Sequence, residues 1–235
     1  YGLIMKVVLG LDVNNTIKET NTMSKQYKPT AQVDFWKGGF GNDYIGRNNS
    51  TEEQIKSKVS MWSKILSSTM STPPSKILEV GANIGLNIRA LQRLHQAEYF
   101  AIEPNKTARD KLSNDNIIPS KNIKDGIAMD IPFNDKLFDL VYTSVVLIHI
   151  HPDNLLDACR EIHRVSSRYI LSIEYFSKTP QDVNYRGNDG YLFKRDFGKF
   201  WLDNFSDLNV VDYGFFWEPM TQLDDYTWWL FEKKN

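Results

Sequence analysis

The chain has 235 residues, a formal net charge of −1 at pH 7 and a single cysteine. Its length suits one α/β domain, and its balanced charge argues against nucleic acid as a partner, because a phosphate backbone attracts a basic surface. No apolar run approaches the roughly 18 residues that a membrane span requires. One cysteine excludes an internal disulfide framework and suits a reducing compartment, so we expect a cytoplasmic protein.

The first 22 residues look unrelated to the domain that follows. They are partly apolar, but they lack the long clean apolar region and the cleavage site of a signal peptide. We expect residues 1–22 to form a loose extension, with a functional arm as the alternative, and residues 23–235 to form a single domain. Within that domain, residues 23–75 would supply a lid and a helix, and residues 76–235 the core.

Residues 32–44 (QVDFWKGGFGNDY) are unusual for a surface segment, because they combine four aromatic residues with three glycines. One interpretation is a hydrophobic cover over an edge of the sheet. The other is a mobile lid that closes over a ligand and excludes water from the reaction. In that case Trp36 would contact the ligand and Arg47 would pair with its carboxylate.

A helix is predicted directly after this segment. Thr51 can cap its first turn, and Glu52 and Glu53 suit the positive end of the helix dipole. Apolar side chains then recur at helical spacing and predict one buried face, formed by Ile55, Val59, Trp62, Ile65 and Leu66.

The rest of the chain is organised around residues 76–87 (KILEVGANIGLN). The apolar residues at their start predict a buried strand. Gly81 and Gly85 allow a tight turn and a close approach of the backbone to a ligand, and Asn83 tolerates the left-handed conformation. Apolar residues at helical spacing follow, so a strand, a glycine elbow and a helix N-terminus form a nucleotide-type pocket, with Glu79 beside the first glycine.

Two acidic residues follow the elbow in the order that such a pocket needs. Residues 99–102 predict a second strand that ends at Glu103, about 20 residues past the elbow, where a carboxylate can accept both hydroxyl groups of a ribose. Residues 126–129 predict a third strand that ends at Asp130.

The remaining elements alternate between helices and strands. We expect a helix from residue 105, a strand at 138–143, a helix from residue 152, a strand at 168–173, and two closing strands at 210–215 and 227–231. The closing strands are joined by a loop with no helix, which favours an antiparallel pair. A polar and aromatic insertion separates them from the strand before.

The elbow, Glu103 and Asp130 together resemble the class I S-adenosylmethionine (SAM) methyltransferases, in which a glycine elbow, an acid for the ribose and an acid beside the adenine occur in this order. The resemblance implies a Rossmann-like α/β fold: a mostly parallel seven-stranded sheet with an antiparallel closing strand and helices on both faces. It also implies SAM as the cofactor. The candidates for binding it are Trp36, Arg47, Glu79, Gly81, Asn83, Gly85, Glu103, Pro104, Asp130, Ile131 and Ser144.

A narrower resemblance extends from about residue 35 to the end of the chain. Six motifs are similar to the pseudaminic acid biosynthesis-associated methylases: FWKG at 35–38, LEVGANIGLN at 78–87, LIHI at 147–150, YRG at 185–187, LFKRDF at 192–197 and VDYGF at 211–215. Gly39 stands where that family has an acid, and Asn188 where it has a histidine. These departures concern the acceptor and not the cofactor. The resemblance implies methyl transfer to a hydroxyl of a nonulosonic acid or another surface-glycan-related small molecule.

The catalytic candidates come from the carboxyl ends of the fourth and fifth predicted strands. His149 is a candidate general base for a hydroxyl acceptor, and the alternative is a structural histidine bonded to the backbone of a turn. Glu174 and Tyr175 end the fifth strand on the same rim of the sheet, where α/β folds bind ligands.

Three further residues are candidates for binding the acceptor: Tyr185, Arg186 and Arg195. The arginines could hold its carboxylate or phosphate, although residues 194–196 equally suit a solvated helix start. No cluster has metal-ligand spacing, so we expect no catalytic metal.

Other readings of the sequence remain open. The fold could serve a catalytically silent binding or scaffold protein, or the acceptor could be a protein or another small molecule. A nicotinamide dehydrogenase would need a glycine where Asn83 stands. The sequence does not indicate an oligomeric state.

Overall fold

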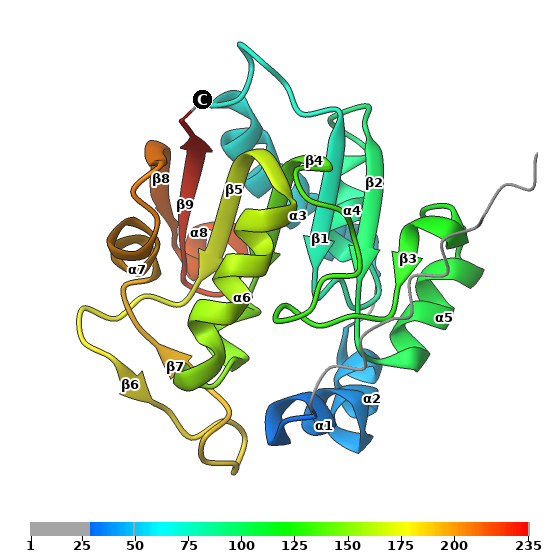
Figure 1. Cartoon of the computed structure of the whole chain (residues 1–235). Coiled ribbons are helices and arrows are strands. Elements are labelled where there is room, and N and C mark those ends of the chain that lie inside the picture. Colours follow the sequence, from blue (N-terminus) through cyan, green and yellow to red (C-terminus); the bar gives the residue numbers. More distant parts are fainter. Residues whose placement is uncertain (1–28, 49, 235) are drawn as a thin grey trace, which may run out of the picture.

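The computed structural model describes residues 29–48 and 50–234. Its centre is a seven-stranded sheet with the strand order β3-β2-β1-β4-β5-β9-β8 (Figure 1). Neighbouring strands from β3 to β5 are parallel, whereas β9 is antiparallel to both β5 and β8. The strands of the sheet are β1 (Lys76–Val80), β2 (Glu98–Ile102), β3 (Ile123–Lys124), β4 (Phe138–Ser144), β5 (Ser166–Glu174), β8 (Leu208–Phe216) and β9 (Tyr226–Lys233).

Helices cover both faces of this sheet, and most of them begin at a capping side chain. Thr51, for example, accepts a hydrogen bond from the backbone N–H of Gln54, as its position predicts. The helices are α1 (Ala31–Lys37), α2 (Gly39–Arg47), α3 (Glu52–Ser67), α4 (Leu86–Leu91), α5 (Lys106–Asn114), α6 (Pro152–Val165), α7 (Phe197–Asn204) and α8 (Glu218–Thr221), with short 3₁₀ turns η1 (Ser120–Asn122) and η2 (Leu147–His149). The predicted architecture is confirmed: this is a Rossmann-like α/β fold with an antiparallel closing strand.

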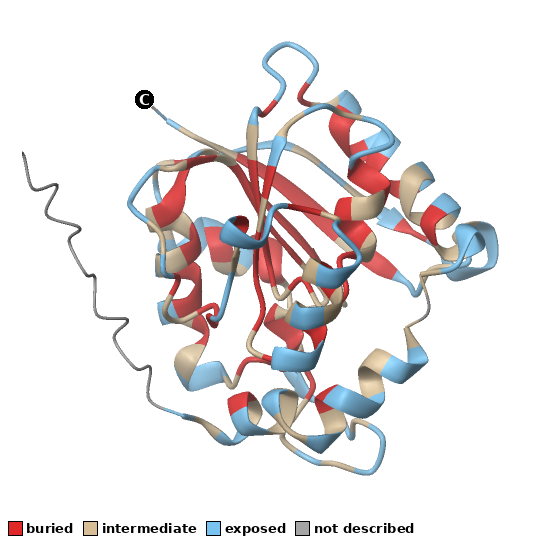
Figure 2. Ribbon diagram, turned by 90° about the vertical axis from the view of Figure 1, so that its right-hand side faces the viewer, coloured by how far each residue is buried: buried red, intermediate tan, exposed pale blue. Residues whose placement is uncertain are grey.

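Alternate residues of each central strand enter two separate hydrophobic cores. Ile77 packs with α3 and α4 on one face, where Trp62 is fully buried. Leu78 and Val80 pack with α6 and α7 on the other face, where Trp201 is almost fully buried. Figure 2 shows these buried residues along the strands and on the helix faces that meet them. The alternation follows from the pleat of a strand, which points successive side chains to opposite faces.

The third strand lies earlier in the chain than predicted. β3 is the residue pair 123–124, which pairs with the end of β2. Residues 126–129 form a turn instead, in which the backbone N–H of Asp130 donates to the carbonyl of Ile127. The turn packs closely, because a Cβ added at Gly126 would lie 2.9 Å from the ring of Pro132.

The connection between the two closing strands also differs from the prediction. α8 forms one helical turn between β8 and β9, because Pro219 starts it and Gln222 ends it in the left-handed conformation, at φ 56°. The predicted antiparallel pairing of these strands is confirmed. The insertion before α7 holds a two-stranded ribbon, β6 (Gln181–Asp182) with β7 (Phe193–Lys194).

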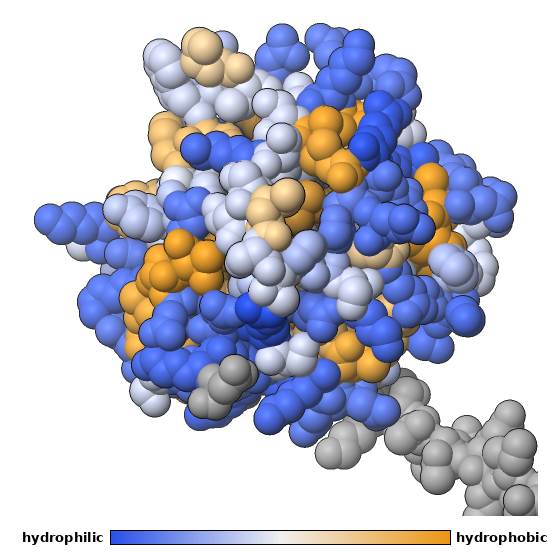
Figure 3. All heavy atoms as spheres, turned by 90° about the horizontal axis from the view of Figure 1, so that it is seen from above, coloured by the Kyte–Doolittle hydropathy of each residue, from blue (hydrophilic) through white to orange (hydrophobic). Residues whose placement is uncertain are grey.

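Two remaining expectations concern the N-terminal extension and membrane spans. The predicted extension at residues 1–22 lies outside the described residues. No helix within residues 29–48 and 50–234 has the length and apolar character of a membrane span. The end of the molecule away from α1 and α2, seen in Figure 3, is mainly hydrophilic with separate hydrophobic areas.

Candidate functional site

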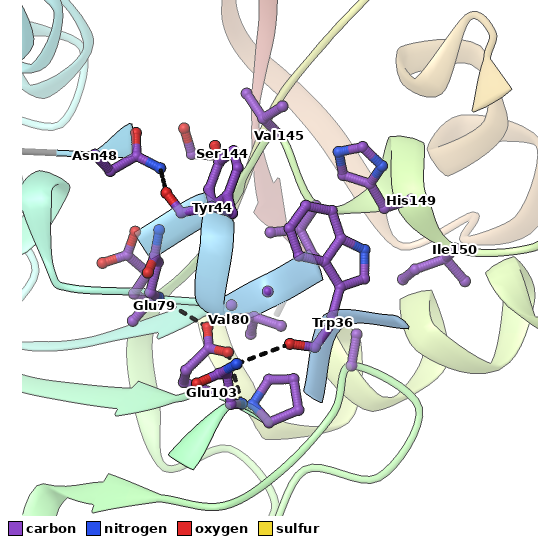
Figure 4. A pocket seen from close by; sticks show the side chains of 18 of the residues that line it. Trp36, Tyr44, Asn48, Glu79, Val80, Glu103, Ser144, Val145, His149 and Ile150 are labelled. Carbon is purple, nitrogen blue, oxygen red and sulfur yellow. Dashed lines mark hydrogen bonds between the residues drawn. The ribbon is translucent and has the colours of Figure 1, made fainter. Parts of the chain in front are cut away.

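A cavity of about 580 Å³ lies at the carboxyl ends of β1, β2 and β4. One wall is the glycine elbow between β1 and α4. The facing wall comes from α1, α2 and α3, which precede the sheet in the chain (Figure 4). The third part of the lining comes from η2, the insertion and the loop before β9. Elements far apart in sequence therefore enclose one space at the rim where α/β folds bind ligands.

The elbow has the backbone that its residue types predict. Gly81 and Gly85 both have φ 76°, and Asn83 has φ 48°, so all three are left-handed. A Cβ at Gly81 would lie 2.7 Å from a methyl group of Val146, which leaves room for a hydrogen atom only. Gly81 and Asn83 line the cavity, whereas Gly85 faces Leu112 of α5 and serves packing.

Glu103 is held rigidly at the end of β2. Its Oε2 accepts a hydrogen bond from the backbone N–H of Asn83, and its Oε1 accepts one from that of Asn105, both at 2.8 Å. Burial raises the pKa of the Glu103 carboxyl, and these two donors oppose the rise. Each carboxylate oxygen has a second lone pair, so the group can still accept two hydroxyl groups from the cavity.

Glu79 lines the cavity, and one of its two carboxylate oxygens lacks a hydrogen bond of ordinary geometry. Its Oε1 accepts a hydrogen bond from Asn87 Nδ2 at 2.7 Å, and Trp62 Nε1 in turn donates to Asn87 Oδ1 at 3.3 Å. The other oxygen, Oε2, is buried and makes no hydrogen bond of ordinary geometry, although the Tyr142 hydroxyl is close enough to lower the pKa of the group. Burial is the larger effect and raises that pKa to about 7. A buried acceptor without a donor is costly, which suits a site that receives its donor from a ligand.

His149 is buried in η2 against the aromatic residues of α1 and the insertion. Its ring lies 4.7 Å from that of Trp36 and 4.9 Å from that of Tyr185. Nδ1 is 2.7 Å from the carbonyl oxygen of Tyr191, so Nδ1 carries the proton and donates. Burial lowers the pKa of His149 to about 4. At neutral pH the ring is therefore uncharged, and Nε2 keeps its lone pair.

The segment predicted to be a lid forms α1 and α2 and is tied to the core. Asn105 Nδ2 donates to the carbonyl of Trp36 and to Asn42 Oδ1, both at 3.0 Å. The Trp36 ring packs edge-on to that of Tyr44 at 5.3 Å. The structure therefore shows this segment as a wall of the cavity, and its movement stays a prediction.

Twelve of the predicted site residues line the cavity: Trp36, Arg47, Glu79, Gly81, Asn83, Glu103, Pro104, Ser144, His149, Tyr175, Tyr185 and Arg186. Five do not: Gly85, Asp130, Ile131, Glu174 and Arg195. For Asp130 and Ile131 the reason is the turn after β3, which presents residues 126–129 to the cavity instead. The backbone N–H of Ile131 donates to Glu161 Oε2 on α6, on the far side of that turn.

Glu174 and Arg195 have structural contacts in place of the predicted roles. The Glu174 carboxylate is fully buried and accepts hydrogen bonds from the backbone N–H groups of residues 146–148, at 3.1 to 3.4 Å. Burial raises its pKa to about 7. The guanidinium of Arg195 stacks over the ring of Phe200 at 5.0 Å, and Asp196 caps α7. The helix start was one of the two readings of this motif.

Sequence reasoning missed several polar residues of the cavity, among them Gln54, Lys58 and Asp224. Gln54 and Lys58 are four residues apart on α3, so they share one face of the helix. Lys58 follows Ile55 by three residues and precedes Trp62 by four, so it lies on the same side of the helix as the buried stripe. This spacing could have identified Lys58 as a residue that faces the interior. Asp224, in the loop before β9, accepts a hydrogen bond from the Tyr175 hydroxyl at 2.6 Å, and no local pattern marked it.

Comparison with known proteins agrees with this geometry. Residues 78–168 match a family described as "Methyltransferase domain". These residues run from β1 into β5, are less than half of the chain, and are similar to methyltransferase domains. An uncharacterized methyltransferase of Staphylococcus carnosus is 28% identical over 118 residues, which are 50% of this chain and 55% of that protein. The match thus spans about half the length of the relative.

Solved structures share this fold at low identity. A SAM-dependent methyltransferase of Leishmania major superposes with a TM-score of 0.65 at 15% identity, over 86% of this chain and 87% of that one. The Burkholderia thailandensis 1,6-didemethyltoxoflavin-N1-methyltransferase, solved with S-adenosylhomocysteine (SAH), gives 0.64 at 15%, over 89% and 93%. These likenesses establish the fold.

The cavity fits SAM. Glu103 presents free lone pairs where a ribose needs acceptors. Gly81 leaves space for a close approach of the ligand to the backbone, and the carboxylate of Glu79 suits the ammonium group of an amino acid. Residues 126–129 also line the cavity. No group of three or more potential metal ligands occurs within the described part of the chain.

Proposed function

We propose that the protein transfers the methyl group of SAM to a hydroxyl group of a small anionic sugar, of the nonulosonic acid type or otherwise related to surface glycans. The observation that carries the proposal is the composition of the cavity. Its carboxylates on β1 and β2 suit the cofactor, while its outer part combines aromatic rings with arginines. The narrower family resemblance of the sequence supports the same acceptor class.

The chemistry needs alignment and exclusion of water more than covalent participation. SAM, when bound, supplies an electrophilic methyl group on a positively charged sulfur, which leaves as a neutral thioether. The protein's part is to hold the acceptor oxygen in line with that methyl group and to close the site. Fixed positioning of this kind can contribute several kcal/mol to the barrier reduction. The α1–α2 wall, tied to Asn105, would keep water away from the reacting atoms.

His149 would accept the proton of the acceptor hydroxyl. The carbonyl of Tyr191 fixes its Nδ1–H, so Nε2 is the basic atom, and the low pKa keeps this atom unprotonated at neutral pH. As the oxygen–methyl bond forms, the hydroxyl proton would pass to Nε2. General bases in enzymes contribute about 10²- to 10⁴-fold in rate. The same contact with Tyr191 is also what a structural histidine would show, so the role of His149 needs its own test.

The outer part of the cavity offers cations without acidic partners. Arg47 lies over the rings of Phe40 and Tyr44, at 5.2 and 5.6 Å. Arg186 lies at the rim beside Tyr185, with a left-handed backbone at φ 51°. Neither arginine forms an ion pair with any described residue. Guanidinium groups bind carboxylate and phosphate by paired hydrogen bonds, and the aromatic rings would pack against the face of a sugar.

Methyl-transfer assays with labelled SAM test this proposal directly. The acceptors should include free and nucleotide-activated nonulosonic acids, neutral sugars of similar size, peptides and RNA. We expect label in the acidic sugars only, and a lower rate with Arg186→Met. Transfer to RNA or peptide with none to any sugar would contradict the acceptor class. SAM binding without transfer to any acceptor would favour a catalytically silent binding protein.

A further inference from the structure

The face of α3 that lines the cavity carries two polar side chains with unmet interactions. Gln54 and Lys58 occupy successive turns of the helix, and both border the cavity. The Oε1 atom of Gln54 is buried and has no hydrogen-bond donor. Lys58 is partly buried, and its Nζ contacts no acidic or carbonyl oxygen within the described part of the chain. The ring of Tyr226 lies 5.8 Å from Nζ to the centroid, and Asp224, which also lines the cavity, is near enough to raise the pKa of Lys58 without forming an ion pair with it.

Lys58 and Glu79 face the same space without touching. Glu79 cannot swing toward the lysine, because Asn87 and Trp62 hold its Oε1 through successive hydrogen bonds. The two groups are near enough for Glu79 to raise the pKa of Lys58 against the lowering effect of burial. No ion pair joins them in the part of the chain that the structure describes. An unpaired cation and an unpaired acid thus border one cavity, an arrangement complementary to a ligand with both charges.

A zwitterionic amino acid group meets these requirements. Its ammonium supplies hydrogen-bond donors for the Glu79 carboxylate, and its carboxylate supplies acceptors for an ammonium side chain. Pairing both groups removes the cost of buried polar atoms without partners, and such charged hydrogen bonds are stronger away from bulk water. The donor of a methyltransferase ends in just such a group, the methionine part of SAM.

We infer that Lys58 binds the carboxylate of the cofactor's amino acid end, while Glu79 binds its ammonium. The inference rests on the proposed function, because it needs SAM in this cavity. It replaces the sequence-based assignment of the carboxylate to Arg47. Arg47 is exposed, and its guanidinium lies over the rings of Phe40 and Tyr44. This leaves Arg47 for the anionic group of the acceptor.

Comparing the affinities of two ligands isolates the contribution of the amino acid end of the cofactor. SAH carries the amino acid, and 5′-methylthioadenosine has the same nucleoside and sulfur without it. Isothermal titration calorimetry with both compounds should compare the parent protein with Lys58→Met, which keeps most of the side-chain volume. Lys58→Arg tests rescue by another cation. Lys56→Met, at an exposed position of the same helix, is the matched control, and Arg47→Met tests the rival residue.

We expect Lys58→Met to weaken SAH binding by about 10- to 150-fold, the range for a hydrogen bond between charged groups. Binding of 5′-methylthioadenosine should change by less than about twofold, which also shows that the variant is folded. Lys58→Arg should recover part of the loss. Equal effects of Lys58→Met on the two ligands, or a loss confined to SAH in Arg47→Met, would overturn the inference. If the parent protein binds neither compound, the proposed function itself fails.

Discussion

The glycine at position 41 offers a sharp test of whether the α1–α2 wall completes the cofactor site. Gly41 lies where α2 crosses the end of α1. A Cβ added there would overlap the carbonyl oxygen of Trp36 and come within 2.9 Å of Asn105 Nδ2. Both neighbours belong to the contact that holds the wall to the core. Gly41→Ala must therefore separate α1 from α2 or break the hydrogen bond from Asn105 to Trp36.

The size of the effect follows from these contacts. Forcing a methyl group into a packed site costs about 1–3 kcal/mol, and backbone atoms cannot rotate away as a side chain does. If SAH binds only to the closed arrangement, Gly41→Ala should weaken its binding by about 5- to 150-fold. Gly46→Ala is the matched control, because a Cβ at Gly46 meets no atom within 4 Å. It lies on the same helix and should leave affinity unchanged.

Calorimetric titration of SAH into both variants measures this difference, and circular dichroism checks that the sheet is intact. Amide exchange of residues 31–47 should slow when SAH is added to the parent protein and stay fast in Gly41→Ala. Equal affinities of the two alanine variants would refute the argument. Exchange rates in the parent protein that do not respond to SAH would show a permanent cover in place of a lid.

Three further predictions address the acids and the histidine of the site. Glu103→Ala should weaken SAH binding by about 1.5–3 kcal/mol, since a charged acceptor is lost; unchanged calorimetric affinity would remove Glu103 from the ribose site. His149→Ala should reduce the methyl-transfer rate by about 10²- to 10⁴-fold with SAH affinity nearly unchanged, and a variant with the parental rate would make His149 structural. Glu174 has a pKa raised from 4.5 to about 7 by burial, so the folded state binds its proton more tightly than the unfolded state does. Its contribution to the free energy of unfolding is therefore fully present below pH 4.5. This contribution, about 3 kcal/mol in all, is lost as the pH rises through 7. Urea unfolding of Glu174→Gln should lack this part of the pH dependence, and an identical pH profile in both proteins would contradict the assignment.

Local sequence sufficed for the backbone of the central motif. Ile77, Leu78 and Val80 form a short apolar run that ends at Gly81, which predicts a buried strand, and the structure confirms it. The left-handed residues of the elbow were predictable because glycine and asparagine accept a positive φ at little cost. Glu103 was predictable for a related reason. A residue that directly follows a parallel strand must lie at the carboxyl edge of the sheet, whatever the rest of the chain does.

Tertiary structure decided where the other side chains went. Glu174 also follows a strand edge, but the N–H groups of residues 146–148 reach it from η2 and remove it from the cavity. The sequence placed Asp130 at the end of the third strand, but that strand, β3, is residues 123–124. β3 is only two residues long, so its position depends on pairing with β2 and not on an apolar pattern in its own sequence.

Tertiary structure also decides the surroundings of Lys58, for which the sequence indicates only the side of the helix on which it lies. Whether it meets solvent or a ligand depends on how α3 packs against α4 and on how the loop before β9 brings Tyr226 beside it. Periodicity specifies the face of a helix on which a residue lies. Only long-range packing, which joins segments more than a hundred residues apart, specifies what that face meets.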